Sequence, residues 1–245
     1  PRNFAPEVHQ AIADIPQAFP MLAQQVRWGA VEVLSDAPGK NDGRAGLAGG
    51  GLTTAALARL VESAQREVLI QSPYVVLSDP ALALFQRARA RGVRVRISTN
   101  SLASTDNLQA FSGYRGQRSA LLAMGIELRE FRPHPRVERD VMERYAALRA
   151  TSPVFALHAK TLVVDRSRVF IGTYNFDPRS ENLNTEVGAI IHDAVQAQRV
   201  AAAIETDMQP ENSWSPAVEA PDSEVPWTKR LQARFWQMMP LRAVL

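Results

Sequence analysis

The chain has 245 residues, of which 46% are hydrophobic and 22% are charged, a composition typical of a folded protein with a sizeable core. It contains no cysteine, which excludes disulfides and thiolate metal sites. No apolar run reaches the ~18 residues of a membrane-spanning helix. The start at Pro1, without a signal-peptide pattern, suggests a fragment of a longer protein.

The charges are unevenly distributed along the chain, although the formal net charge is only +3. Residues 87–149 contain thirteen Arg and six Asp or Glu, whereas residues 205–224 contain six acidic residues and no basic ones. A basic central region suits an anionic partner such as phospholipid or nucleic acid. A general preference for Arg over Lys would produce the same pattern, because the chain has 25 Arg and three Lys.

The first half of the chain is predicted to alternate between helices and strands. Residues 1–35 are expected to form a connecting arm that ends in a strand near residues 30–34, and the glycine-rich residues 35–51 a flexible loop. Asp79 and Pro80 signal the start of a helix that ends at Gly92. The predicted elements are helix 53–65, strand 68–71, helix 79–92, strand 93–97, helix 114–124 and strand 126–131.

The second half continues this alternation. Residues 133–153 form a charged insertion bounded by prolines, in which His134 is expected to be a plain surface histidine. A hairpin, a strand at 186–191 and a helix at 194–208 follow. Strands and helices at this spacing predict an α/β domain over residues 36–209, followed by an acidic linker and an amphipathic helix in residues 210–245.

The hairpin is predicted for residues 157–175, which read LHAKTLVVDRSRVFIGTYN. The turn is expected at Asp165–Arg168, and placing Val164 opposite Val169 aligns the apolar residues of the two strands. Directly opposed residues lie on the same face of a sheet. This register therefore gathers four polar side chains on one face, with His158 opposite Asn175 and Lys160 opposite Thr173.

Two more polar residues, Asn184 and Glu186, share a face at the start of the next predicted strand and complete this cluster. An imidazole, an ammonium, a hydroxyl and an amide beside a carboxylate are the groups expected of a phosphate site. The alternative is a buried polar network that only fixes the fold. That alternative is disfavoured because burying a lysine for that purpose alone is costly.

Five side chains of the cluster have predicted roles at phosphorus. Lys160, Thr173 and Asn175 are expected to bind the phosphate oxygens through a point charge and hydrogen bonds. His158 is the candidate nucleophile or general acid, and Glu186 would hold its ring in one tautomer.

The pattern His158-x-Lys160, Asp165 and Gly172–Asn175 resembles the HxKxxxxD…GSxN signature of the phospholipase D superfamily, with Thr173 in place of the usual serine. The resemblance implies an α/β/α sandwich with a central mixed sheet flanked by helices. It implies that Glu186 orients the histidine and that Asp165, although part of the catalytic signature, is mainly structural. It also implies a two-step reaction through a phosphohistidine, without metal or cofactor.

Further segments are similar to the second half of bacterial cardiolipin synthases, so the resemblance extends from about residue 30 to the end. It implies a phosphatidyltransferase that acts on anionic or zwitterionic phospholipids. Phospholipid is thereby favoured over nucleic acid as the partner. The basic central region and the tail helix together would make the protein peripheral on the bacterial inner membrane. The similar segments are residues 98–106 with Tyr114 and Arg115, residues 177–180 and 183–186, and residues 239–245.

The family mechanism needs two histidines on opposite sides of phosphorus, and this chain has one copy of the motif. The other histidines, His9, His134 and His192, are not followed by lysine at the second position. The leading hypothesis is therefore half an active site, completed by a second HxKxxxxD half in a longer chain. The alternatives are a homodimeric phosphodiesterase or nuclease, with one motif from each chain, and a non-catalytic binding module.

The tail contains a predicted amphipathic helix. Trp227, Leu231, Phe235 and Met238 recur at helical spacing, with Lys229, Arg230 and Arg234 elsewhere around the helix. Such a helix either docks on the protein body or lies on an anionic membrane surface. We favour docking on the protein body, because the apolar stripe of a helix usually packs against the hydrophobic core.

Overall fold

The computed structural model describes residues 28–40, 50–143 and 154–239, together with positions 6, 10, 13 and 26. Contacts divide the chain into residues 1–30 and residues 31–245. The fold described below is that of the second unit.

The second unit is built on one eight-stranded mixed sheet in the order β1-β7-β6-β5-β2-β3-β4-β8. Strands β2, β3 and β4 run parallel to one another, and the other neighbours are antiparallel. The strands are β1 Val31–Ser35, β2 Glu67–Gln71, β3 Arg94–Asn100, β4 Glu127–Phe131, β5 Thr161–Val164, β6 Arg168–Gly172, β7 Val187–Ile191 and β8 Ser213–Trp214.

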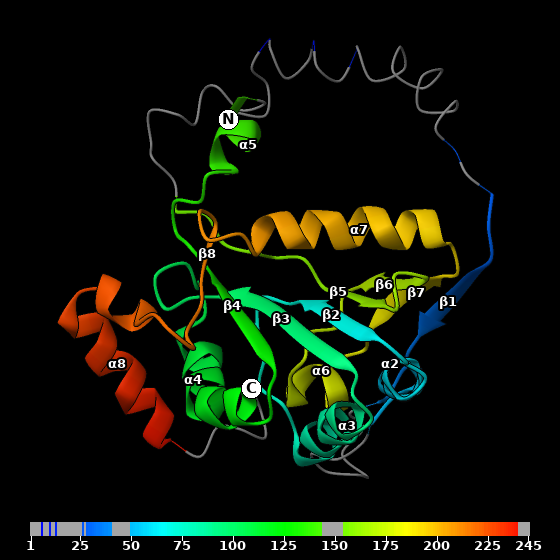
Figure 1. The fold of residues 1–245 in the computed structure, drawn as a ribbon, viewed down its shortest axis with the longest axis horizontal. Helices are drawn as coiled ribbons and strands as arrows, with labels where there is room; N and C mark the ends of the chain where they lie inside the picture. Colours follow the sequence, from blue (N-terminus) through cyan, green and yellow to red (C-terminus); the bar gives the residue numbers. More distant parts are fainter. Residues whose placement is uncertain are drawn as a thin grey trace. The chain divides into compact units, whose positions relative to one another are not determined.

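Helices cover both faces of this sheet (Figure 1). The helices are α2 Leu52–Glu62, α3 Asp79–Ala90, α4 Leu108–Ala123, α5 Glu138–Glu143, α6 Pro178–Asn182, α7 Ala194–Asp207 and α8 Trp227–Met238, with a 3-10 turn, η3, at Pro221–Glu224.

Alternation along the strands divides the core into two layers. Leu69 of β2 and Val163 of β5 pack against α7 on one face, whereas Ile70 and Leu162, one position away, pack with α2, α3 and α4 on the other. Successive side chains of a strand point to opposite faces, so these buried runs must be apolar on both. The predicted α/β/α sandwich with a central mixed sheet is confirmed.

Several helices begin differently from the sequence prediction, because side-chain hydrogen bonds at the N-cap determine where a helix starts. Helix α3 is capped by Ser78, whose side chain accepts from the backbone of Ala81, and not by Asp79. Helix α4 starts six residues before the predicted 114, because the Asn107 side chain accepts from Ala110. The short elements α6 and β8 were not predicted.

The predicted arm and tail both contribute elements to the sheet unit. Strand β1 lies in the predicted arm, yet it pairs with β7 as an edge strand of the sheet. Strand β8 from the predicted linker pairs with β4, and α8 packs against α4. Part of the charged insertion forms α5, and its residues 144–153 lie outside the described residues.

The predicted hairpin register is wrong by one residue. Val163, not Val164, lies opposite Val169, and the loop is the three residues 165–167. Asp165 adopts a positive φ of 52° because its carboxylate accepts hydrogen bonds from the backbone of residues 65–67, which pulls the turn onto the start of β2. A one-residue shift changes every cross-strand partner. Lys160 therefore lies opposite Gly172, whose N–H donates to its carbonyl, and not opposite Thr173.

The docking predicted for the apolar stripe of α8 is also wrong. The helix docks on α4, but through Ala233, which is fully buried. The stripe itself faces solvent, with exposed fractions of 67% at Trp227, 56% at Leu231, 48% at Phe235 and 78% at Met238.

Candidate active site

The predicted site residues converge on one edge of the sheet. Strand β5 begins where β2 ends, since Thr161 lies opposite Gln71. Strand β6 ends and β7 begins at the same edge, with Gly172 opposite Gly188. His158 and Lys160 immediately precede β5, so both lie at the carboxyl end of the parallel strands, where α/β sheets commonly bind ligands.

The backbone before His158 is fixed by the buried Asn100. Its side chain accepts from Leu157 N at 2.8 Å and donates to Leu157 O at 3.0 Å. Asn100 also accepts from Ser104 Oγ, and it is 2% exposed at the end of β3. The exposed imidazole of His158 therefore projects from a rigid segment.

The ammonium of Lys160 lies beside His158. Its Nζ is 3.4 Å from His158 Nε2 and 3.3 Å from the His158 carbonyl oxygen. Burial lowers the pKa of Lys160, and the charges of Glu186, Asp177 and Asp106 oppose that shift. Among the described residues no carboxylate comes within ion-pair distance of this ammonium, so it has hydrogen bonds to offer to an anion.

Thr173 and Glu186 form the second part of the site. The Thr173 hydroxyl donates to Glu186 Oε2 and accepts from Val187 N at 3.0 Å. Glu186 is 3% exposed. The bonds among the described residues include none between Glu186 and His158, so the role of Glu186 in orienting the ring stays a prediction.

Asn175 has a free acceptor at the site. Its N–H donates to Ser180 Oγ at 3.1 Å, and Ser180 N in turn donates to Asp177 Oδ1 at the start of α6. The side-chain oxygen of Asn175 is buried and has no hydrogen-bond partner among the described residues.

A buried ion pair near Glu186 was missed by the sequence reasoning, which predicted a flexible loop there. Lys40 Nζ lies 2.7 Å from Asp36 Oδ2, and their side chains are 3% and 0% exposed. Asp36 accepts from Glu186 N at 3.1 Å and from Thr53 N at 2.9 Å, and Lys40 also donates to Ser180 O. We call Asp36 and Lys40 the buried clamp, because it fixes the backbone of Glu186 and the start of α2.

The clamp carboxylate is ionised. Burial alone would raise the pKa of Asp36, but the hydrogen bonds from Lys40, Thr53 and Glu186 outweigh burial and hold the pKa below its usual value. The role depends on the hydrogen bond between Asp36 and Glu186, which are 150 positions apart, so no local sequence signal marks it.

A cavity of about 500 Å³ opens beside this carboxylate side of the site. His158 and Lys160 lie outside its lining. The lining residues are Thr173, Asn175, Leu183, Asn184, Thr185 and Glu186.

Asp165 is not brought to the site. It lies beyond the far end of β5 from Lys160, a separation of about 16 Å along the strand. Its carboxylate accepts from the backbone of Gln65, Arg66 and Glu67 and its carbonyl accepts from the Arg66 guanidinium, so its contacts are those of a turn residue.

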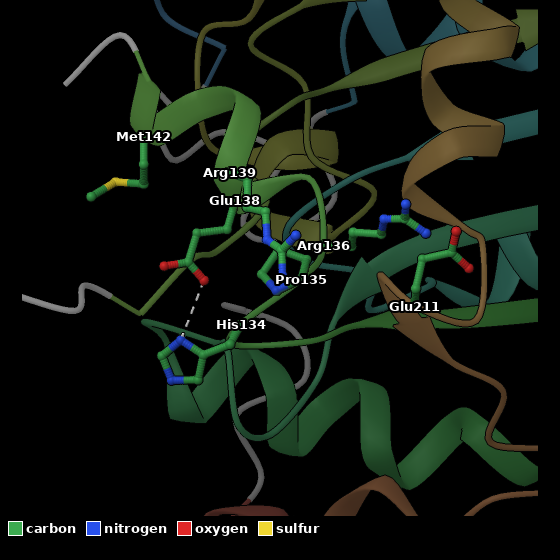
Figure 2. A pocket seen from close by; sticks show the side chains of 7 residues that line it. All are labelled: His134, Pro135, Arg136, Glu138, Arg139, Met142 and Glu211. Atoms are coloured by element: carbon green, nitrogen blue, oxygen red, sulfur yellow. Dashed lines mark ion pairs between the residues drawn. The ribbon is translucent and has the colours of Figure 1, made fainter. Parts of the chain in front are cut away.

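The other histidines lie apart from this cluster. His134 lines a separate pocket of about 710 Å³ near α5 and pairs with Glu138 at 3.6 Å (Figure 2). His192 lies 3.9 Å from Glu32 at the end of β7, and His9 is outside the described residues. The pocket in Figure 2 contains none of the motif residues.

Two structural features are absent from the residues that the structure describes. Among these residues, no group of three His, Asp or Glu is arranged to hold a metal ion. None of the helices in the described part of the chain has the length and hydrophobicity to cross a bilayer.

Residues 57–208 match the family described as "Cardiolipin synthase, PLD-like domain". Cardiolipin synthase C of Escherichia coli K12 is 36% identical over 173 residues, which are 71% of this chain and 36% of that protein. An uncharacterized protein of Helicobacter pylori J99 is 27% identical over 86% of this chain and 39% of its own length. The chain thus spans little more than a third of these relatives.

Solved structures share the fold at low sequence identity. Phosphatidylserine synthase of Haemophilus influenzae aligns with a TM-score of 0.55 and 16% identity, over 88% of this chain and 48% of that one. The phospholipase D family member NUC of Salmonella typhimurium aligns with a TM-score of 0.51 and 18% identity, over 76% and 98%. The family match covers more than half of the chain, so the chain belongs to the phospholipase D-like domain family of cardiolipin synthases.

Proposed function

We propose that this chain supplies one half of the active site of a phosphatidyltransferase, which transfers a phosphatidyl group between alcohols through a phosphohistidine. The observation that carries the proposal is the meeting of His158 and Lys160 with Thr173, Asn175 and Glu186 at one edge of the sheet. Family membership supports the same class of reaction.

In the first step, His158 Nε2 attacks phosphorus. A P–N bond forms while the P–O bond to the leaving alcohol breaks, and a second imidazole protonates that alcohol. Lys160 and Asn175 hold the non-bridging oxygens, where negative charge accumulates. Thr173 and Asn175 line the cavity beside Glu186, so their polar groups are placed to bind a phosphodiester that enters it.

In the second step, the incoming alcohol attacks phosphorus from the side that the first alcohol left. It gives its proton to the second imidazole, and the P–N bond breaks to restore His158. Water in place of the alcohol would give hydrolysis. The same donors serve both steps because the charge on the phosphoryl oxygens is similar in each.

The second imidazole must come from another motif, since in-line displacement places nucleophile and leaving group on opposite sides of phosphorus. An exposed apolar strip beside the site offers a place for that half to pack. Val33, Ile171 and Val187 share one face of β1, β6 and β7 and are 74%, 43% and 48% exposed. Val187 directly follows Glu186, so one end of this strip lies at the edge of the sheet that carries the catalytic groups, although the side chains of the strip point to the opposite face from that of Glu186.

A homodimer is the second candidate arrangement. The alignment with NUC covers 98% of that chain and 76% of this one, so the solved NUC chain contains one fold of this kind and little else. Two copies related by a twofold axis would each supply one histidine and one lysine.

We also infer that the protein works peripherally at the bacterial inner membrane, where its phospholipid substrates lie. The charge distribution supports this, because residues 87–149 carry thirteen Arg against six acidic residues.

The test uses His158→Ala in the enzyme assembled with its second motif, assayed with phosphatidylglycerol in mixed micelles. We expect loss of turnover and of acid-labile labelled phosphate on the protein, because the imidazole is the acceptor of the phosphatidyl group. His192→Ala is the matched control, since His192 pairs with Glu32 away from the site. Turnover at the wild-type rate by the His158 variant would refute the assignment.

Sedimentation and mixing distinguish the two arrangements. The 245-residue chain alone, if monomeric, is expected to show no turnover. If it dimerises and is active, mixing it with His158→Ala chains should lower the activity per wild-type chain. Normal turnover by a monomer would overturn the half-site proposal.

A further inference from the structure

Helix α8 presents its apolar face away from the described part of the second unit. A surface helix normally buries that face against the core. Here Trp227, Leu231, Phe235 and Met238, which we call the α8 stripe, are between 48% and 78% exposed. At 100° per residue these side chains span only about 80° of the helix circumference, so they form one continuous surface.

The orientation of α8 is fixed by its opposite face. Ala233 is fully buried and belongs to the main hydrophobic core. Arg115 of α4 donates to Gln237 Oε1 at 2.7 Å, and Lys229 and Trp236 are half-buried. Turning the stripe inward would break this packing, so its exposure is a property of the folded unit.

The charges on α8 have one sign. Residues 227–238 contain Lys229, Arg230 and Arg234 and no acidic residue. Arg230 and Arg234 are exposed and lie along one border of the stripe at helical spacing. A cationic border along exposed Trp, Leu and Phe matches the surface of an anionic bilayer, where basic groups meet the headgroups and the apolar groups enter the acyl boundary.

The stripe is remote from the surface assigned to the second half. Strand β1 and the exposed apolar strip lie at one end of the sheet order, and α4 and α8 lie near β4 and β8 at the other. Figure 1 shows α8 and β1 on opposite sides of the unit. A partner half placed over His158 and Val187 would therefore leave α8 uncovered.

We propose that the α8 stripe is a membrane-contact surface that inserts into anionic phospholipid bilayers. This inference rests on the proposed function only in that the substrate is a phospholipid. The helix lies in the plane of the interface, Trp227 and Phe235 bury in the acyl boundary, and the arginines bind lipid phosphates.

The experiment measures flotation of the full chain with vesicles of phosphatidylcholine, with or without phosphatidylglycerol. The chain should bind only the vesicles that contain phosphatidylglycerol, and more weakly as salt increases. The double variant Leu231→Glu, Phe235→Glu should partition at least about 10-fold less, because it removes two apolar side chains from the contact. Val218→Glu, at a position 85% exposed outside α8, is the matched control and should bind like the wild type.

Two more variants separate the electrostatic contribution to vesicle binding from the catalytic function. Arg230→Gln with Arg234→Gln should weaken binding and flatten its salt dependence, whereas His158→Ala should bind vesicles normally while losing turnover. Failure of the catalytic proposal would thus leave vesicle binding intact. Circular dichroism and thermal melting check that each variant is folded.

Equal flotation of the wild type and the Leu231, Phe235 double variant would overturn the proposal. So would a double variant that changes self-association in lipid-free sedimentation and leaves vesicle binding unchanged, because the stripe would then contact protein.

Discussion

Two buried glutamates of the sheet have opposite surroundings. Glu186 at the start of β7 is 3% exposed, bonds Thr173 and lines the site cavity. Glu130 in β4 is fully buried, accepts from Tyr114 at 2.8 Å and lies 2.9 Å from the Arg118 guanidinium. Only the first faces a space that a substrate can enter.

The enclosed carboxylate, Glu130, has a perturbed pKa. Burial raises the pKa of Glu130 to about 7, although Arg118 and Tyr114 oppose the shift. Arg118 also pairs with Asp222 at 2.8 Å, so the cluster links α4, β4 and η3. A strongly shifted pKa is often taken to mark a functional site. Here it marks a structural junction, and contact with the cavity is the better guide to function.

Among the variants that test this comparison, Glu186→Gln should have the largest effect on activity. We expect Glu186→Gln to lower kcat on the order of 10²–10³-fold, because an amide lacks the negative charge beside Lys160 and the acceptor strength needed at the histidine. Steady-state kinetics of the assembled enzyme measure this fall in kcat. Glu130→Gln is the matched control, and an equal loss of kcat in both variants would contradict the distinction.

Breaking the buried clamp should affect stability first and activity second. Lys40→Met leaves the Asp36 carboxylate buried without its cation and should lower the free energy of unfolding by about 3 kcal/mol. Because Asp36 bonds the Glu186 N–H, we also expect kcat to fall about 10-fold, with KM little changed.

Urea unfolding and kinetics of Lys40→Met test the clamp. The double variant Asp36→Asn, Lys40→Met should recover part of the lost stability, since no unpaired charge remains. A loss of stability with an unchanged kcat would restrict the clamp to a role in folding.

Local patterns in the sequence predict the helices, strands and motif residues that depend only on residues near one another in the chain. Period-two and helical spacing located β2, β3, α3 and α7 to within a few residues, and the motif spacing identified His158 with its polar neighbours. The motif match covers residues 158–186, a short stretch of chain.

The errors arose from partners that are distant in the chain. The hairpin register depends on bonds from Asp165 to residues about 100 positions away, and the buried clamp depends on Glu186, 150 positions from Asp36. The stripe of α8 has the same helical period whether it packs inward or outward, so only the tertiary contacts of Ala233 reveal its orientation. Periodicity identifies the apolar face of a helix but not what covers it.

Glu130 is expected to have the smallest effect on activity, and its titration changes the stability of the protein instead. Its pKa rises from 4.5 to about 7 on folding, so between these values the folded state binds more protons than the unfolded state. Stability increases with pH only where the unfolded state binds more protons, and therefore this group makes the protein less stable as pH rises. At about 1.4 kcal/mol per pKa unit, the loss across the window is at most about 3 kcal/mol.

Glu130→Gln removes this titration and isolates it from the other shifted groups. The difference in free energy of unfolding between the wild type and the variant, measured by urea at several pH values, should shift in favour of the variant from pH 4.5 to 7 and level off above. Glu62→Gln is the control, because Glu62 is half exposed and pairs with Arg87 at the surface. A constant difference between wild type and Glu130→Gln would mean that the carboxylate keeps its ordinary pKa. In that case the ion pair with Arg118, and not burial, would dominate its surroundings, and the two glutamates would differ only in their access to the cavity.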